Sequence, residues 1–431
     1  MKSFDIFDTL IGRNYFFQDS IFREMEEKDM YPNFLSLRKQ AEYEAHTKTL
    51  DGIYDKFAEI TGIDSEAAQK LKSAELNLEF SRTFPIMTLL PQLEKDSILI
   101  SDSFYTKDQL SKLLTLNGIT PDKYADIVCS YDGKSSGRVW SSIRPEHHTG
   151  DNIESDVNSP RRNGINATHF SYSSLSEIEE KILEFGLPKL AALCRKVRLS
   201  NAWPDDKLTR LWEDQSDINI PLLVLISIHL HNTYESVGKE LLFSERDCNI
   251  LHKVYKILFP NSGAEVFYTS RECYSKATDT FIDYARLMYD PNKSVIVDLQ
   301  GTGKSATSFF SKIFGKEPEL FFVVYSDLNN TVKCEYLVHR ASGFTDVIER
   351  LNYSSLGSVT DVVSGRPVRK AIASNGYVAM QQFISSMACS FLSKGHKIET
   401  ELPNDYIVLI RYLLYAAEGS IMGSLVNHEE M

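Results

Sequence analysis

The stretch Phe4-Asp5-Ile6-Phe7-Asp8-Thr9-Leu10 opens the chain and decides how its first part is interpreted. Its apolar start is typical of a short buried strand, which would put Asp5 at the carboxyl end of that strand. Ligands of open α/β sheets bind at this edge. A second acidic segment at 148–156, HTGDNIESD, carries Asp151 and Asp156, and carboxylate oxygens suit Mg²⁺. The sequence therefore predicts two acidic loops around one crevice.

Two further motifs lie between these segments. Ser101 follows the apolar run 98–100, and Lys134 lies in Gly133-Lys134-Ser135-Ser136-Gly137. In this order, the four motifs resemble those of haloacid-dehalogenase-superfamily (HAD) hydrolases over about residues 1–170. The resemblance implies a Rossmann-like parallel sheet that carries an aspartate nucleophile and binds Mg²⁺.

The resemblance also implies a role for each motif. Asp5 would be the nucleophile, and Ser101 and Lys134 would bind the phosphoryl group. A carboxylate that attacks an anionic group needs a divalent cation and an ammonium to screen the charges, so the set is chemically coherent. The expected site residues are, for catalysis, Asp5, Asp8, Ser101 and Lys134 and, for the metal, Asp5, Asp151, Asp156 and the backbone carbonyl of Phe7.

One position departs from the usual phosphatase pattern. Phe7 stands where these enzymes have a second aspartate as general acid, and the carboxylate falls at Asp8. On an extended strand end, a shift of one residue turns a side chain to the opposite face. Either Asp8 bends back to act as the acid, or water or the substrate protonates the leaving group. An inactive, ligand-binding relic is the competing interpretation of this domain.

A structural interpretation also competes at the second motif. Ser101, Asp102 and Ser103 could cap the helix predicted over Thr106–Leu116, because aspartate and serine favour helix N-termini.

An all-helical insertion separates the first two motifs. Within about residues 16–93, apolar spacings of three and four predict four helices, at Ser20–Met25, Leu35–Lys48, Leu50–Thr61 and Ser65–Phe80. The insertion resembles the cap that closes over the active site in one large HAD subfamily. Nothing in the segment identifies the substrate.

The chain is expected to divide after the fourth motif. The predicted organisation is a HAD-like domain at 1–174, a linker helix at 175–200 and a second α/β domain at 201–431. Strands are predicted at Glu240–Phe243, Glu265–Tyr268, Ser294–Leu299 and Leu320–Tyr325, with helices between them, which is typical of a parallel sheet. Apolar stripes at Met380–Leu392 and Tyr406–Glu418 predict helices that close the domain. They could also support a homodimer.

Polar residues follow three of these strands and predict a second phosphate-binding site. The last loop is rich in glycine and opens a helix at 306–314, so its N–H groups could hold a phosphate. The expected residues are Arg246, Asp247, Ser270, Arg271, Asp298, Thr302, Gly303, Lys304 and Ser305.

Residues of about 240–330 weakly resemble a phosphoribosyltransferase-like domain. Asp298, Thr302, Gly303 and Ser305 match the loop that grips the 5-phosphate of phosphoribosyl pyrophosphate (PRPP), whereas Val297 and Lys304 depart from it. The alternative is an α/β domain without nucleotide, in which the arginine and aspartate residues pair structurally.

Composition limits the remaining possibilities. A net charge of −12 disfavours nucleic acid as a partner. The six cysteines form no CxxC pair, which predicts reduced thiols. No leader precedes Phe4, and the longest apolar stretch, Ile220–Ile228, is too short to span a membrane. A cytoplasmic protein without membrane contact is expected.

Two functions follow from the motifs. The preferred one is a Mg²⁺-dependent phosphohydrolase that acts on a phosphorylated nucleotide or sugar and is fused to a phosphate- or nucleotide-binding domain. The alternative is a phosphoribosyltransferase-like transferase, or a nucleotide-sensing effector, whose HAD-like domain is regulatory or a relic. A non-enzymatic scaffold leaves the ordered acidic motifs unexplained.

Overall fold

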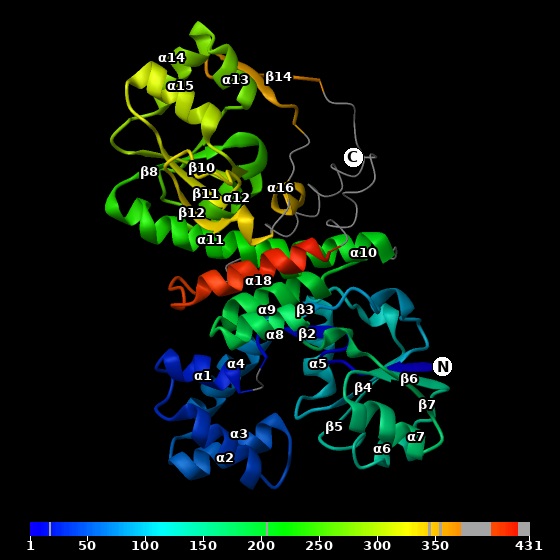
Figure 1. Cartoon of the computed structure of the whole chain (residues 1–431). Coiled ribbons are helices and arrows are strands. Elements are labelled where there is room, and N and C mark those ends of the chain that lie inside the picture. The colour runs from blue at the N-terminus through cyan, green and yellow to red at the C-terminus, as the bar shows by residue number, and fades with distance from the viewer. Residues whose placement is uncertain (17–18, 204–205, 344–345, 353–355, 372–397, 421–431) are drawn as a thin grey trace. The chain divides into compact units, whose positions relative to one another are not determined.

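A computed structural model describes the chain except for residues 17–18, 204–205, 344–345, 353–355, 372–397 and 421–431 (Figure 1). It divides into two compact units. Unit 1 is Met1–Leu175 with Arg198–Pro204, and unit 2 is Ser176–Val197 with Asp205–Met431. Each unit contains a five-stranded sheet in which every pair of neighbouring strands is parallel. The predicted α/β class is confirmed.

The unit 1 sheet has the strand order β5-β4-β1-β6-β7. Its strands are β1 (Lys2–Phe4), β4 (Ile98–Asp102), β5 (Asp126–Ser130), β6 (His147–Gly150) and β7 (Asn166–His169). From β1 the chain builds outward through β4 and β5, and it then returns to the other side of β1 for β6 and β7. The strand order therefore switches beside β1, and ligands of open α/β sheets bind at the carboxyl ends of strands at such a point.

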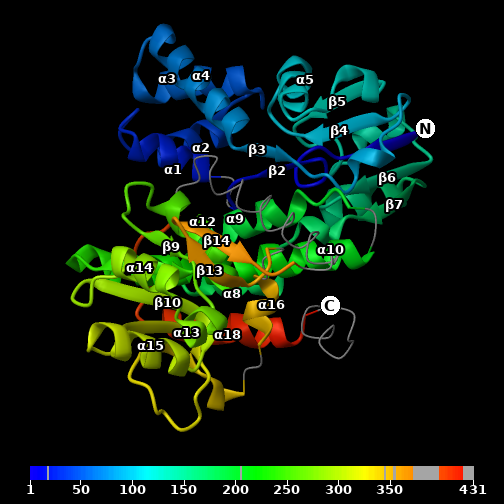
Figure 2. The same ribbon diagram turned by 90° about the horizontal axis from the view of Figure 1, so that it is seen from above.

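The predicted helical insertion lies between two short antiparallel strands of unit 1, β2 (Ile11–Arg13) and β3 (Thr83–Pro85). Its helices are α1 (Ser20–Glu27), α2 (Phe34–Glu44), α3 (Leu50–Thr61) and α4 (Ser65–Ser81), which confirms the four predicted helices. They form a group to one side of the sheet (Figures 1 and 2).

One predicted boundary in the insertion is wrong. The helix predicted to reach Lys48 ends at Glu44, and Ala45 is already extended. The Lys48 ammonium turns back and donates to the carbonyl oxygens of Glu42, at 2.6 Å, and Tyr43, at 2.8 Å. Because the last carbonyls of a helix have no partner within the helix, a lysine that satisfies them favours a stop.

Unit 2 has the strand order β12-β11-β10-β8-β9. The strands β8 (Glu240–Ser244), β9 (Glu265–Phe267), β10 (Ser294–Gly301) and β11 (Glu319–Tyr325) confirm the four predicted strands. An unpredicted edge strand, β12 (Glu335–His339), adds to them. The order switches between β8 and β10, which is the kind of position at which open α/β sheets bind ligands.

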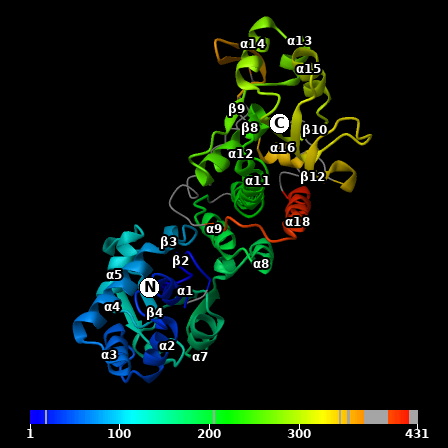
Figure 3. The same ribbon diagram turned by 90° about the vertical axis from the view of Figure 1, so that its left-hand side faces the viewer.

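Helices cover both faces of the unit 2 sheet (Figure 3). On one face are α13 (Arg271–Lys276), α14 (Asp279–Met288) and α15 (Lys304–Phe314). On the other are α11 (Ile220–Thr233), α12 (Glu245–Leu258) and α18 (Tyr406–Glu418). The helix α18 has the predicted bounds, whereas the stripe at Met380–Leu392 lies outside the described residues. Unit 2 further contains α16 (Val347–Leu351) and the hairpin of β13 (Val359–Val363) and β14 (Arg366–Arg369).

The single linker helix predicted at 175–200 is wrong. The segment forms two helices, α8 (Glu177–Glu184) and α9 (Pro188–Leu199), and α10 (Asp206–Glu213) follows. Gly186 has a φ of 79° and Pro188 begins the second helix. A left-handed glycine terminates a helix, and a proline is tolerated in the first turn of the next one.

Two further expectations concern the whole chain. Among the described residues, Cys129, Cys194, Cys248, Cys273 and Cys334 are all free thiols. In the same part of the chain, none of the helices is both long enough and apolar enough to cross a membrane.

Candidate active site

Asp5 lies at the point where the strand order of unit 1 switches. It directly follows β1, and its backbone N–H donates a 2.9 Å hydrogen bond to the carbonyl oxygen of Thr149 in the neighbouring strand β6. Only 5% of Asp5 is exposed. Ser101 is the last residue but one of the adjacent strand β4, and Asp151 directly follows β6. Both therefore lie at the same carboxyl-end edge of the sheet as Asp5. The topology therefore brings the predicted motifs together.

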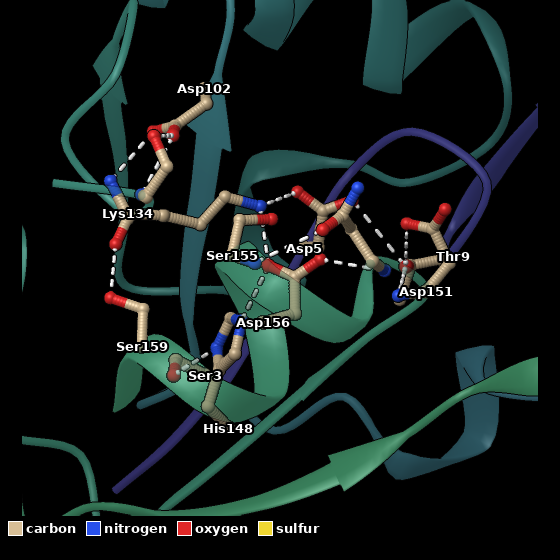
Figure 4. A network of polar contacts seen from close by, with 12 residues as sticks. Ser3, Asp5, Thr9, Asp102, Lys134, His148, Asp151, Ser155, Asp156 and Ser159 are labelled. Carbon is tan, nitrogen blue, oxygen red and sulfur yellow. Dashed lines mark hydrogen bonds and ion pairs between the residues drawn. The ribbon is translucent and has the colours of Figure 1, made fainter. Parts of the chain in front are cut away.

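The Lys134 side chain joins two of these motifs. Its ammonium contacts a carboxylate oxygen of Asp5 and lies 2.6 Å from Oδ1 of Asp156 (Figure 4). All three side chains are buried. A lysine between two carboxylates stays protonated, and the two acids raise its pKa despite the burial that opposes this.

The backbone of Lys134 is held on both sides by residues that the motifs did not single out. Its N–H donates to Oδ1 of Asp102, at 2.8 Å. Its carbonyl oxygen accepts hydrogen bonds from the Ser159 hydroxyl, at 2.5 Å, and from Nε1 of Trp140, at 3.2 Å. These contacts fix where the ammonium points (Figure 4).

The alternative role for Asp102 as a helix cap is wrong. The helix α5 (Lys107–Leu116) has Thr106 as its N-cap, in a reciprocal capping box with Gln109. Ser101 and Asp102 belong instead to β4, and Asp102 binds the loop that carries Lys134.

Asp156 is also held by residues of β6 and of the loop that follows it. His148 of β6 contacts its Oδ1 through Nε2, at 3.1 Å, and Ser3 of β1 through Nδ1, at 2.8 Å. The N–H of Asn152 donates to its Oδ2, at 3.0 Å. A Cβ atom at Gly150 would lie 2.4 Å from the Asp156 carboxyl carbon, so this close approach requires glycine.

Thr9 connects Asp5 to Asp151. Its hydroxyl oxygen accepts from the Asp151 N–H at 3.1 Å, and it lies 3.4 Å from Oδ2 of Asp5 and 3.3 Å from Oδ1 of Asp151. Carboxylate oxygens of Asp5, Asp151 and Asp156 all lie within 4.8 Å of one another. This spacing and ligand type fit a hard divalent cation such as Mg²⁺.

The electrostatics also favour a cation. The three carboxylates and the Lys134 ammonium carry a net formal charge of −2 when ionised. Burial raises the pKa of Asp5, and burial together with the charge of Asp8 raises the pKa of Asp151 to about 6. Burial opposes ionisation at Asp156 as well, but Lys134 and His148 lower its pKa to about 2. A divalent cation would relieve the excess negative charge at the first two residues.

Asp8 faces the same pocket as Asp5, so the expected turn to the opposite face is wrong. The strand β1 ends at Phe4, and Asp8 has a φ of 55°, so the alternation of an extended strand does not apply. Arg13 lies 3.9 Å from Oδ2 of Asp8 through Nη1, and its guanidinium carbon stacks 3.9 Å from the centre of the Phe7 ring.

A pocket of ≈ 1050 Å³ encloses this arrangement. The residues that line it include every catalytic and metal residue expected from the sequence, namely Asp5, Phe7, Asp8, Ser101, Lys134, Asp151 and Asp156. Residues of the helical insertion, such as Lys39 and Glu42 of α2, form another part of its wall.

A second pocket, of ≈ 460 Å³, lies at the carboxyl ends of the unit 2 strands. Its lining includes eight of the expected residues, which are Asp247, Ser270, Arg271, Asp298, Thr302, Gly303, Lys304 and Ser305. The ninth, Arg246, is the second residue of α12, but its side chain lies outside what the structure describes.

Two of these residues already have partners within the protein, whereas a neighbouring glutamine has an oxygen atom without one. The Ser270 hydroxyl caps α13 and donates to the carbonyl of Val359, at 2.6 Å. Lys304 pairs with Asp327 at 3.1 Å, although half of its side chain is exposed. The sequence did not single out Gln300, which lines the pocket, is 6% exposed and has an Oε1 atom without a hydrogen-bond partner.

A scan against protein-family models finds no match for the chain, and a search of the curated proteins finds no significant similarity.

Proposed function

We propose that unit 1 is a Mg²⁺-dependent phosphohydrolase that acts on a phosphorylated nucleotide or sugar. One observation carries the proposal: the Asp5 carboxylate, the Lys134 ammonium and the carboxylates of Asp151 and Asp156 meet at the carboxyl end of β1. Phosphoryl transfer depends mainly on positioning and on charge stabilisation, and this cluster supplies both.

Each residue has a defined task in this proposal. Asp5 attacks the phosphorus with its buried carboxylate, which lies in the pocket, and the bond from phosphorus to the leaving oxygen breaks. Water then attacks the phosphoryl group on Asp5, which releases phosphate and restores the carboxylate. Lys134 neutralises the phosphoryl oxygens, and Ser101 donates a hydrogen bond to them. Mg²⁺, held by Asp5, Asp151 and the carbonyl of Phe7, would polarise the phosphoryl group. Asp156 positions Lys134, since both of its oxygens already accept hydrogen bonds.

Asp8 supplies the proton to the leaving group. It lines the same pocket as Asp5, and a third of its side chain is exposed, so it can exchange protons with water. Nη1 of Arg13 lies 3.9 Å from Oδ2 of Asp8, close enough for an ion pair. The left-handed turn at residue 8 supports this role, because Asp8 lines the pocket of Asp5 although Phe7 holds the usual sequence position of the acid.

The test is hydrolysis by the purified full chain, with and without Mg²⁺, of acetyl phosphate and a panel of phosphorylated metabolites. We expect Mg²⁺-dependent release of phosphate, and a loss of at least about a thousandfold in Asp5→Asn, which keeps the side-chain shape. Asp96→Asn is the matched control because Asp96 is exposed and distant from the pocket. Equal activity of Asp5→Asn and the parent chain would refute the assignment.

A specific observation favours a second function, the binding of a phosphorylated ligand by unit 2. The N-terminus of α15 has no side-chain cap, and its first residues line the pocket with Gln300. Uncapped N–H groups and the Lys304 ammonium attract a phosphate, while Oε1 of Gln300 can accept a hydrogen bond from a ligand hydroxyl or amide. A transferase or a nucleotide-sensing effector would use such a site.

Calorimetry with PRPP and with inorganic phosphate tests this second function. Lys304→Ala should weaken binding about tenfold, whereas Lys312→Ala, an exposed lysine near the other end of α15, should not. Gly303 is unsuitable for substitution, because its φ is 70° and a Cβ atom would lie 2.9 Å from Leu320. If neither ligand binds the parent chain at millimolar concentration, the loop is only a helix start.

A further inference from the structure

The pocket of unit 1 is much larger than a phosphoryl group requires. Asp5, Ser101 and Lys134 occupy one edge of it, whereas its ≈ 1050 Å³ reach the top of the range of about 300–1,000 Å³ that encloses drug-sized ligands. The rest of the wall comes from the loops that follow β4 and β5 and from the helical insertion. The group that carries the phosphate should therefore be large.

Aromatic rings and charged side chains share the pocket wall. Seven of the residues that line the pocket are phenylalanine or tyrosine, and two of them follow neighbouring strands. Phe104 lies two residues beyond β4, and Tyr131 lies directly after β5. Neighbouring strands are about 4.8 Å apart, so these loops begin about 5 Å and about 10 Å from β1, which carries Asp5. A nucleoside 5′-phosphate bound at Asp5 would place its base at this distance.

A buried arginine of the insertion contacts the Phe104 ring and is linked to Tyr131 through Glu42. Arg38 of α2 is fully buried, and its guanidinium carbon lies 5.2 Å from the centre of the Phe104 ring. Its Nη1 donates to Glu42 at 2.9 Å, and the hydroxyl of Tyr131 donates to the other oxygen of Glu42 at 3.3 Å. The two aromatic residues are thus preorganised, which lowers the entropy cost of stacking a ligand between or upon them.

We propose that the substrate of unit 1 is a nucleoside 5′-phosphate whose base stacks on Phe104 and Tyr131. The inference rests on the proposed phosphohydrolase function and chooses between its two substrate classes. A sugar phosphate has no planar π system and can contact these rings only through its C–H groups, whereas a nucleobase stacks on them face to face. Each of the nucleobases has a flat face that stacks on aromatic side chains.

The test compares two ligands that share the same phosphate ester. Adenosine 5′-monophosphate (AMP) and ribose 5-phosphate differ only in the base. Their affinities are measured by calorimetry with Mg²⁺ on the full chain carrying Asp5→Asn, which prevents turnover. We expect AMP to bind at least about tenfold more tightly. Tyr131→Ala and Phe104→Leu should each remove most of this advantage without weakening ribose 5-phosphate, whereas Tyr131→Phe should keep it.

Tyr336→Ala is the matched control, because Tyr336 of unit 2 is as exposed as Tyr131, at 41% against 42%, and lies outside the pocket. An AMP advantage that survives both Tyr131→Ala and Phe104→Leu would place the base elsewhere and overturn the inference, as would equal affinity for the two ligands.

Hydrolysis of acetyl phosphate, which is activated and has no ring, separates this inference from the function on which it rests. If the parent chain hydrolyses acetyl phosphate but shows no preference for AMP, the phosphohydrolase stands and the nucleotide inference fails. If the Tyr131-dependent preference holds and acetyl phosphate is untouched, the base-binding wall stands and the hydrolase function fails.

Discussion

Asp151 is the residue through which pH should act on the candidate active site. Burial and the charge of Asp8 raise its pKa to about 6. Because a carboxylate must be deprotonated to bind a cation, Mg²⁺ should bind weakly below this pH and tightly above it. We expect the rise in melting temperature that Mg²⁺ causes to grow between about pH 5 and about pH 7, as measured by differential scanning fluorimetry.

The same experiment has an internal control. Asp8→Asn removes a charge that raises the pKa of Asp151, so the midpoint of the Mg²⁺ effect should move to lower pH. Asp96→Asn removes an exposed charge outside the pocket and should leave the midpoint in place. A midpoint that is the same in all three proteins would contradict the coupling between Asp8 and Asp151.

A second prediction at this scale concerns Asp8 as the acid. An alkyl leaving group such as the 5′-oxygen of a ribose needs a proton, whereas acetate leaves readily without one. Asp8→Asn should therefore slow hydrolysis of a ribose 5-phosphate ester about a hundredfold or more and change acetyl phosphate hydrolysis little. Steady-state rates on the two substrates provide the measurement. Equal slowing of the two substrates would mean that Asp8 does not donate the proton and affects the rate only through its neighbours Arg13 or Asp151.

Some residues of the candidate site could be predicted from the sequence and others could not, for a physical reason. Asp5, Lys134 and Asp151 stand out because charged residues beside strand ends and glycines are chemically conspicuous. Thr9 and His148 do not, since a threonine in an apolar stretch and a histidine within a strand look like ordinary core residues. Their contacts with Asp151 and Asp156 depend on strand pairing, such as that of Ser3 with His148, which no local pattern encodes.

At the scale of elements, a buried ion pair joins two helices of the insertion, α2 and α4. Arg38 of α2 binds both oxygens of Glu75 in α4, at 2.8 and 2.9 Å, and neither side chain is exposed by more than 2%. Replacing Arg38 by Met leaves the Glu75 carboxylate buried without this partner, which should cost about 3–5 kcal/mol. Faster amide hydrogen exchange in α2 and α4, measured by mass spectrometry, would reveal the loss.

The neighbouring residue supplies the control for this prediction. Lys39 also lies on α2 and also forms an ion pair, with Asp19 at 3.1 Å, but more than half of its side chain is exposed. An exposed pair contributes about 0–1 kcal/mol, so Lys39→Met should barely change the exchange. If the two variants behave alike, the buried pair does not hold α2 to α4.

Periodicity predicted the elements of this chain better than their ends. Apolar spacing located α3 and α18 because it reports which face of a helix is buried. The end of α2 was missed because it depends on Lys48, which folds back onto the helix from four residues beyond it. The break between α8 and α9 was missed although Gly186 and Pro188 signal it, because the apolar pattern continues across them.

At the scale of the whole molecule, the two units repeat one physical arrangement. Each has a parallel sheet with its own buried core and a polar pocket at the carboxyl ends of its strands. The pockets differ in charge. In unit 1, Lys134 contacts Asp5 and Asp156, and Asp151 lies close to both acids. The pocket of unit 2 combines the acids Asp247, Glu272, Asp298 and Glu349 with Arg271, Lys304, Lys370 and the start of α15. We therefore predict that unit 1 requires a cation before it accepts a phosphate and that unit 2 does not.

This difference predicts which unit each ligand stabilises. Mg²⁺ alone should slow hydrogen exchange in the elements around Asp5 and Asp151 and leave β10 and α15 unchanged. PRPP in the presence of a chelator should do the reverse, because the metal-free acidic cluster of unit 1 repels phosphate. A ligand at a hundred times its Kd stabilises the unit that binds it by about 2.7 kcal/mol, which exchange mass spectrometry resolves. Protection of α15 by Mg²⁺ alone, or of β1 and β6 by chelated PRPP, would contradict this division, because the charge of each pocket would then not determine its ligand.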